Sequence, residues 1–315
     1  MKLLAALAAY VKLKQSLGAV FAADRRILRS LGHHLGDLPM DAVTPDACWA
    51  FCMGAGAVTR FAERKHQTLR GFFTYLTARG HLAVSPLPEP GPRAVRTFQP
   101  YIYTYAELRR LLDATAILAT PRWPLRELTF RTLLLTLYGA GLRAGEALRL
   151  RDGDVDLDTR VLAIWDTKFF KSRLVPIGTD LGSALTTFRA QRTGPAHASG
   201  DAMAFFPSRT GAAVTLACLE RTFVRLRVHA GIHRPASDRW QPRLHDIRHS
   251  FALHRLIAWY RAGADVQAGL PLLATYLGHR NVTGTQPYLT MTPALLAAAS
   301  QRFAGYAALA GEVTP

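Results

Sequence analysis

The feature that most limits how this chain can fold is a proline-rich segment about a third of the way along it. Its prolines are Pro86, Pro88, Pro90, Pro92 and Pro100. Proline has no amide hydrogen and a fixed φ, so it is disfavoured in helix interiors and in central strands. We therefore predict that residues 86–100 form a linker between a domain of residues 1–85 and a domain of residues 101–315. The length of 315 residues suits two domains of ordinary size.

The first domain is predicted to be entirely helical. Residues 21–31 carry apolar side chains at helical spacing, and Thr44 followed by Pro45 is typical of a helix cap with proline in the first turn. Residues 58–78 form a long amphipathic run that Gly80 ends. These patterns favour a compact helical unit.

The second domain combines helices with two short strands. It opens at Thr104, where Thr-Tyr-Ala-Glu matches a capping box. Residues 161–165 and 172–177 are β-branched or apolar runs joined by a basic connection, which indicates a hairpin. Helical patterns cover residues 125–148 with a break near Gly139 and Gly141, and then 179–192, 216–230, 245–260, 271–277 and 292–309. The fold class expected is mainly α with a small antiparallel β-sheet (α+β).

The charge of the chain points to a polyanionic partner. It has 39 Lys and Arg against 22 Asp and Glu, a formal net charge of +17. Clustered cations bind nucleic acid by releasing counterions from phosphates, so nucleic acid is favoured over an anionic membrane surface. Within the first domain the cations Arg60, Arg64, Lys65 and Arg70 share one predicted helix. They either contact a DNA backbone or form a solvated surface.

Other classes are disfavoured by what the sequence contains. No run approaches the roughly 20 apolar residues of a membrane span, and the run from Leu3 to Val11 is followed by lysines. The cysteines are Cys48, Cys52 and Cys218, in no zinc-like spacing. They support neither a disulfide framework nor a cysteine-rich metal site, and we expect a cytoplasmic protein.

Two segments of the second domain carry side chains suited to phosphate chemistry. Arg143 follows a glycine turn and opens a helix, where a guanidinium and free amides can bind one phosphate and Glu146 can orient the guanidinium. The alternative is a surface ion pair. Lys168 lies at the hairpin tip, where a lysine can protonate a leaving oxygen. Lys171 and Arg173 follow closely, and we predict that they contact DNA. Taken alone, a solvated turn lysine is the simpler interpretation.

Two further segments lie nearer the C-terminus. His245 and Arg248 are three residues apart, so they share a helix face and can address the same anion. His249 makes a zinc pair with His245 conceivable, but no glutamate follows the first histidine as in hydrolytic zinc helices, and we expect no metal. His279 follows Gly278, and Tyr288 comes nine residues later. A tyrosine there either reaches an anion site or simply packs.

In their order and spacing these segments resemble the tyrosine recombinase (phage integrase) family. The resemblance covers residues 100–303. The sequence motifs on which it rests are Gly-Leu-Arg-Ala-Gly-Glu, Lys-Ser-Arg-Leu-Val-Pro-Ile, His-Asp-Ile-Arg-His-Ser-Phe and Leu-Gly-His. The active-site positions of the family fall on Arg143, Lys168, His245, Arg248, His279 and Tyr288. Two departures are a long stretch over residues 257–272 and Pro287 directly before the tyrosine. The run after Tyr288 resembles recombinases borne by transposable elements.

The resemblance implies a site-specific recombinase that joins Tyr288 to a DNA 3′-phosphate and frees a 5′-hydroxyl. It implies that Arg143 and Arg248 stabilise the phosphate charge, that Lys168 is the general acid, and that His245 and His279 assist, with no cofactor. It also implies a helical core-binding domain that clamps duplex DNA together with the catalytic domain.

The same resemblance implies synaptic homotetramers and accessory or sister recombinases. The last predicted helix offers Leu295, Leu296 and Phe303 for packing on a neighbouring protomer or within its own chain. A type IB topoisomerase and a non-catalytic DNA-binding protein that keeps the fold are the alternatives.

Overall fold

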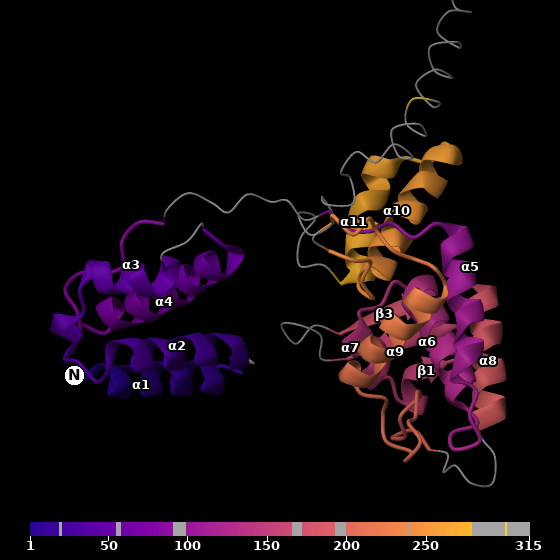
Figure 1. Ribbon diagram of the computed structural model, residues 1–315, viewed down its shortest axis with the longest axis horizontal. Helices are drawn as coiled ribbons and strands as arrows, with labels where there is room; N and C mark the ends of the chain where they lie inside the picture. The colour runs from indigo at the N-terminus through magenta and orange to yellow at the C-terminus, as the bar shows by residue number, and fades with distance from the viewer. Residues whose placement is uncertain are drawn as a thin grey trace, which may run out of the picture. The chain divides into compact units, whose positions relative to one another are not determined.

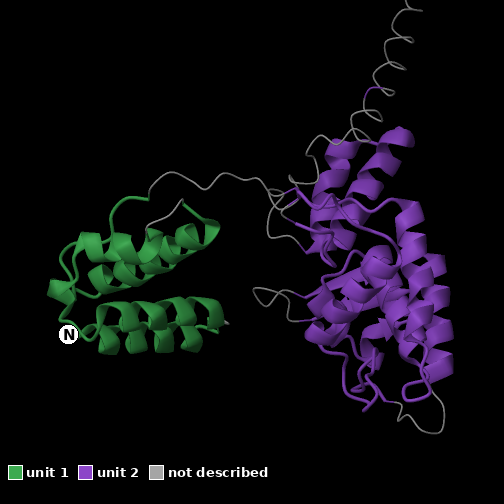
Figure 2. Ribbon diagram, in the orientation of Figure 1, with its two compact units in different colours: residues 1–97 green, residues 98–315 purple. Residues whose placement is uncertain are grey.

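The computed structural model describes residues 1–18, 21–54, 58–90, 99–165, 172–192, 200–238, 240–278 and 300. The chain divides into two compact units, residues 1–97 and residues 98–315, shown in different colours in Figure 2. The predicted helix over residues 292–309 lies outside the described residues, apart from Ser300. None of the helices in the described part of the chain is long and apolar enough to cross a membrane.

The first unit is built from helices that pack side by side (Figure 1). They are α1 (Leu3–Ser16), α2 (Ala22–Leu35), the short 3-10 turn η1 (Met40–Ala42), α3 (Pro45–Met53) and α4 (Arg60–Ala78). The predicted cap at α3 is confirmed, because the Thr44 hydroxyl accepts from the Ala47 amide at 3.3 Å. Thr59 caps α4 in the same way. Leu28, Phe72 and Phe73 are fully buried in the core of this unit.

The first part of the proline-rich segment packs against the first unit. Leu82 and Leu87 lie against its core, and the carbonyl of Pro88 is 2.8 Å from Nε2 of the buried His66. As predicted, the described prolines of this segment lie outside helices and strands. A proline keeps its carbonyl acceptor and an apolar ring, so the segment can still pack against the first unit. Part of the predicted linker is therefore joined to the first unit.

The second unit begins with a run of helices. They are α5 (Tyr105–Asp113), the 3-10 helix η2 (Ala114–Leu118), α6 (Arg126–Gly139) and α7 (Ala144–Arg149). The capping box predicted at Thr104 is present, because the Thr104 amide donates to Glu107 at 2.8 Å and the Glu107 amide donates to the Thr104 hydroxyl at 3.2 Å. Phe130 and Leu133 of α6 are fully buried in the core.

The small sheet has three antiparallel strands in the order β1-β2-β3. They are β1 (Val155–Asp156), preceded by the 3-10 turn η3 (Asp152–Asp154), β2 (Val161–Ile164) and β3 (Arg173–Pro176). The predicted hairpin is confirmed, and its last described pair is Ile164 opposite Arg173. The two-residue β1 was not predicted, because it is too short to show an alternating pattern.

The remaining helices cover the sheet and α6. They are α8 (Thr179–Arg192), α9 (Leu216–His229), α10 (Asp246–Arg261) and α11 (Val266–Leu277). The predicted start of α11 at Pro271 is wrong, because the Asp265 carboxylate caps the helix by accepting from the Ala268 amide at 3.1 Å. Pro271 therefore lies inside the helix, in its second turn. Helices α10 and α6 pack together, which brings Arg248 over the turn after α6.

Candidate active site

Arg143 stands at the N-terminus of α7 and is held there by Glu146. The Arg143 amide donates to Oε2 of Glu146 at 3.0 Å, and its Nη1 donates to Oε1 at 2.7 Å. Glu146 is only 4% exposed, so the pair is not the solvated surface pair that the sequence left open. The side chain of Arg143 is 35% exposed, so an anion in solution can reach it.

The Glu146 carboxylate is the centre of a cluster of arginines. Besides Arg143 it accepts from Nη1 and Nη2 of Arg173 at 3.2 and 2.8 Å, and Nη1 of Arg248 lies 3.8 Å from Oε2. Burial opposes ionisation of this carboxyl. The hydrogen bonds and charges of Arg173 and Arg143 outweigh it, and the pKa of Glu146 falls to about 2. The carboxylate is therefore ionised at neutral pH.

Arg173 is not the exposed DNA contact that its place near the hairpin tip suggested. Its side chain is 10% exposed, and its Nε donates to the Tyr276 carbonyl at 2.9 Å. Successive residues of a strand point to opposite faces. Arg173 therefore shares the inner face with Val175, which is fully buried, whereas Leu174 is 68% exposed. The sequence of β3 does not show this direction, because Leu174 and Val175 are both apolar and either could have faced the core.

Arg248 is buried in the second unit and binds two backbone carbonyls. Its Nη1 donates to the Gly141 carbonyl at 2.7 Å, and its Nη2 donates to the Leu277 carbonyl. Gly141 has φ of +58°, and a Cβ there would lie 2.5 Å from Cδ1 of Phe251. The glycine turn before Arg143 is thus required both by its backbone conformation and by the close packing of α10.

Three different arginines hold the C-terminal end of α11. Arg173 binds the carbonyl of Tyr276, Arg248 that of Leu277, and Nη2 of Arg143 that of Gly278 at 3.1 Å. The last carbonyls of a helix lack partners within the helix and carry its negative dipole end, so cations are favoured there. The cluster therefore fixes the chain immediately before His279.

Gly278 makes this arrangement possible, and replacing it tests the cluster. It has φ of +66°, and a Cβ there would lie 2.7 Å from Nη1 of Arg173. We expect Gly278→Ala to lower the free energy of unfolding by about 2–3 kcal/mol, the sum of left-handed strain and displacement of Arg173. Chemical denaturation of purified protein measures this change.

The matched control is Gly263→Ala in the same unit. Gly263 has φ of +69° with open space around it, so its substitution carries the strain alone, about 1 kcal/mol. Equal losses in the two variants would show that Arg173 does not depend on the space beside Gly278.

His245, at the N-cap of α10, and His249, in its first turn, lie beside the cluster. Partial burial, and then the positive charges of Arg248 and Arg243, lower the pKa of His245, although the residue keeps an exposed face. His249 packs edge-on against His245 with ring centroids 5.0 Å apart, and burial lowers its pKa to about 4. Both rings are therefore neutral at pH 7, and a neutral imidazole can accept a proton.

The structure brings together Arg143, Glu146 and Arg248, with His245 at the N-cap of α10, the helix that carries Arg248. The other predicted site residues Lys168, Lys171, His279 and Tyr288 lie outside the described residues. No group of three or more potential metal ligands (His, Cys, Asp or Glu) occurs within the described ranges. An anion that approaches this cluster meets the exposed side chain of Arg143 and the neutral imidazole of His245. Arg248 is 2% exposed and donates to two backbone carbonyls, so in this arrangement it adds positive charge from beneath the surface.

The helix predicted to contact DNA, α4, uses two of its four cations within the first unit. Nη2 of Arg64 is 2.6 Å from Oδ1 of Asp24. Lys65 donates to the Phe51 carbonyl at 2.8 Å, and its ammonium lies over the Phe51 ring. Arg60 and Arg70 are exposed.

Comparison with known proteins places the chain among DNA recombinases. The model of the phage integrase family matches residues 104–294. A Sinorhizobium fredii protein named as an integrase/recombinase, y4rE, is 37% identical over 294 residues, which cover 93% of each chain. The tyrosine recombinase XerC of Xylella fastidiosa is 30% identical over 236 residues, which cover 74% of this chain and 70% of the relative.

Solved structures share the fold at lower identity. The integrase of the Tn1549 transposon, in complex with transposon right end DNA, has a TM-score of 0.70 and 19% identity, covering 96% of this chain and all of that one. A lambda integrase tetramer bound to a Holliday junction has a TM-score of 0.67 and 16% identity, covering 91% of this chain and 77% of that one.

Proposed function

The chain belongs to the phage integrase family, an enzyme family that cuts and rejoins DNA, and from this premise we propose how its own residues carry out site-specific recombination. The observation that carries the proposal is the convergence of Arg143, Arg248 and the end of α11 around the buried Glu146. Such a cluster supplies fixed positive charge next to the chain that leads to His279. The substrate we propose is duplex DNA at a defined site.

In the proposed reaction the Tyr288 oxygen attacks a DNA phosphorus, and the bond to the 5′ oxygen breaks. Arg143 and Arg248 stabilise the charge that develops on the non-bridging oxygens, a contribution of several kcal/mol per donor in comparable sites. Lys168 donates a proton to the departing 5′ oxygen, and neutral His245 accepts the proton of Tyr288. His279 hydrogen-bonds the phosphate. Rejoining reverses these transfers without a cofactor.

A covalent trapping assay tests this function. Wild-type protein and Tyr288→Phe are incubated in EDTA with nicked duplex DNA from the flanks of the gene, and the products are separated on a denaturing gel. We expect a slowly migrating adduct with the wild type only, because phenylalanine lacks the oxygen that would be joined to the phosphate. Binding without an adduct would favour a non-catalytic DNA-binding protein. An adduct with Tyr288→Phe would exclude Tyr288 as the nucleophile.

For DNA binding by the first unit we propose Arg60 and Arg70 as phosphate contacts. The logarithm of the DNA association constant falls linearly with the logarithm of the salt concentration. Each lost phosphate contact makes this slope less steep by about 0.9. We expect Arg60→Ala and Arg70→Ala each to show this reduction in a fluorescence anisotropy titration. Arg64→Ala should change the slope less, because Asp24 already compensates the Arg64 charge. A larger effect of Arg64→Ala would contradict this assignment.

For the assembly we propose a homotetramer on two paired DNA sites. Strand exchange joins ends from two duplexes, so two pairs of protomers meet, and Leu295, Leu296 and Phe303 are our candidates for the contact between neighbours. Accessory or sister recombinases are further proposed partners, and Lys171 is proposed to contact DNA beside Lys168. We propose that the enzyme acts on nucleoid DNA in the cytoplasm, for integration, excision or transposition of a mobile element.

A further inference from the structure

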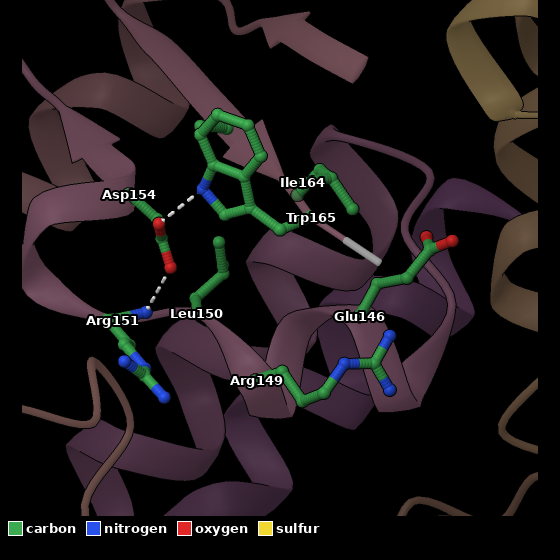
Figure 3. Close-up of a pocket in the computed structure, with 8 residues that line it drawn as sticks. Glu146, Arg149, Leu150, Arg151, Asp154, Ile164 and Trp165 are labelled. Carbon is green, nitrogen blue, oxygen red and sulfur yellow. Dashed lines mark hydrogen bonds between the residues drawn. The ribbon is translucent and has the colours of Figure 1, made fainter. Parts of the chain in front are cut away.

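The end of strand β2 is held by a side chain that the reaction scheme does not use. Trp165 follows the last described strand pair, Ile164 with Arg173. Its Nε1 donates to Oδ1 of Asp154 at 2.7 Å, and Oδ2 of Asp154 accepts from the Arg151 amide at 2.8 Å. Figure 3 shows this chain of hydrogen bonds, which ties the end of β2 to the turn η3.

The indole of Trp165 is not a core side chain. The residue is 57% exposed and borders a cavity of about 410 Å³, which Glu146 and Arg149 also line (Figure 3). A tryptophan that contributes mainly by burial would have its ring packed on both faces. Here the hydrogen bond to Asp154 sets the position of the ring, so a change that removes only the N–H group leaves the core intact.

The other end of the hairpin is anchored by Arg173, which binds Glu146 and the Tyr276 carbonyl. Lys168 is three residues after Trp165 and five before Arg173 in the sequence. Three extended residues span at most about 11 Å. Trp165 is therefore the nearer of the two anchors, and its position limits where the Lys168 ammonium can go.

We propose that Trp165 is a positioning residue which, through its hydrogen bond to Asp154, fixes the start of the segment that delivers Lys168 to the 5′ oxygen. This inference rests on the proposed role of Lys168 as general acid. Proton donation depends steeply on the placement of the donor, and a displacement of about 1 Å is enough to slow a reaction substantially. Loss of the anchor therefore slows the protonation of the leaving oxygen and leaves DNA binding unchanged.

The step to be probed is the departure of the leaving group. When Tyr288 attacks, the bond from phosphorus to the 5′ oxygen breaks, and Lys168 gives that oxygen a proton. In a substrate with sulfur in place of the bridging 5′ oxygen, the bond from phosphorus to sulfur breaks instead. A thiol has a pKa of about 8.5, so the sulfur leaves as a thiolate and needs no proton. A defect confined to proton donation disappears with this substrate.

The experiment compares Trp165→Phe with the wild type on both substrates, with the single-turnover rate of adduct formation as the readout. Phenylalanine keeps an aromatic ring and removes the N–H donor. We expect a rate about tenfold lower with the 5′ oxygen, a near wild-type rate with the 5′ sulfur, and equal DNA affinity. Trp123→Phe is the matched control, because Trp123 packs on Phe130 at the start of α6 and is expected to keep the full rate on both substrates.

Two results would overturn the inference: an undiminished rate of Trp165→Phe with the 5′ oxygen, or an equal loss on both substrates, which would indicate a general structural role. Lys168→Ala tests the premise separately. If sulfur restores Lys168→Ala, Lys168 is the general acid, and Trp165→Phe then decides the positioning role alone. If sulfur does not restore Lys168→Ala, the proposed role of Lys168 fails, and the inference fails with it.

Discussion

Replacing Glu146 with glutamine is expected to lower the free energy of unfolding by about 3–5 kcal/mol at pH 7. Arg173 and Arg248 are buried beside this carboxylate, and glutamine leaves their charges uncompensated. Removal of one partner from a buried ion pair has costs of this size, because the remaining charge stays desolvated. Urea denaturation at neutral pH measures the change. Adduct formation should also fall, since Glu146 orients Arg143.

The same variant has an expected signature in the pH dependence of stability. The pKa of Glu146 is about 2 in the folded protein against an ordinary value of 4.5. A lowered folded pKa stabilises the protein fully above pH 4.5, and this stabilisation is lost as the pH falls towards 2. The full contribution is roughly 3 kcal/mol. Between pH 6 and pH 3 the wild type should therefore lose more stability than Glu146→Gln.

Glu107→Gln is the control for the denaturation at pH 7. Glu107 occupies the equivalent place in the capping box of α5, where it is half-buried and its oxygens accept from Tyr101 and Thr104. A change at a helix cap of this kind costs about 1 kcal/mol. A similar loss at both positions would mean that the arginine cluster adds nothing to the capping interaction at Glu146.

The second large effect is expected from Arg248→Lys. A guanidinium donates in two directions at once, and Arg248 uses this to bind the carbonyls of Gly141 and Leu277. Lysine is a single point charge on a flexible stem and cannot bridge both. We expect the rate of adduct formation to fall about a hundredfold to a thousandfold, as for loss of a group that stabilises transition-state charge. The free energy of unfolding should fall by about 1–3 kcal/mol.

Single-turnover cleavage and denaturation of the same preparation separate these two effects. Arg131→Lys serves as the control, because Arg131 is 41% exposed in its side chain, pairs with Asp113 at 3.6 Å and donates to one carbonyl, that of Leu112, at 2.9 Å. It should leave the cleavage rate within experimental error of the wild type and lower the free energy of unfolding by no more than about 1 kcal/mol. If Arg248→Lys retained the full cleavage rate, the proposed contact between Arg248 and the phosphate would be excluded.

Much of the fold was predictable from local patterns. The caps at Thr44 and Thr104, and the hairpin strands at residues 161–165 and 172–177, were predicted from residue types that satisfy local backbone groups or match one spacing. The start of α11 was missed because Pro271 resembled a first-turn proline, whereas Asp265 caps the helix one and a half turns earlier. Asp265 as a cap and Pro271 as a first-turn proline are both local patterns, so the sequence alone did not show which of them begins the helix. The packing of the folded chain decides between the two.

For the candidate site, the sequence motifs predicted residue types and their order but not their contacts. Arg143, His245 and Arg248 were predicted from short motifs, and the pairing of Arg143 with Glu146 follows from helix spacing. The inward side chain of Arg173 and its bond to the Tyr276 carbonyl join β3 to α11, which are about a hundred residues apart in the chain. No local pattern records such a contact.

The sequence by itself therefore determined the helical class, the division near the proline-rich segment, the basic charge and the set of residues to which we assign the proposed chemistry. These properties depend on neighbouring residues or on composition. The tertiary structure alone decided which arginines meet at Glu146, which carbonyls at the end of α11 they bind, and that Trp165 anchors the hairpin to Asp154. Those outcomes depend on packing between distant segments, because a buried carboxylate is stable only where the whole fold brings compensating charges to it.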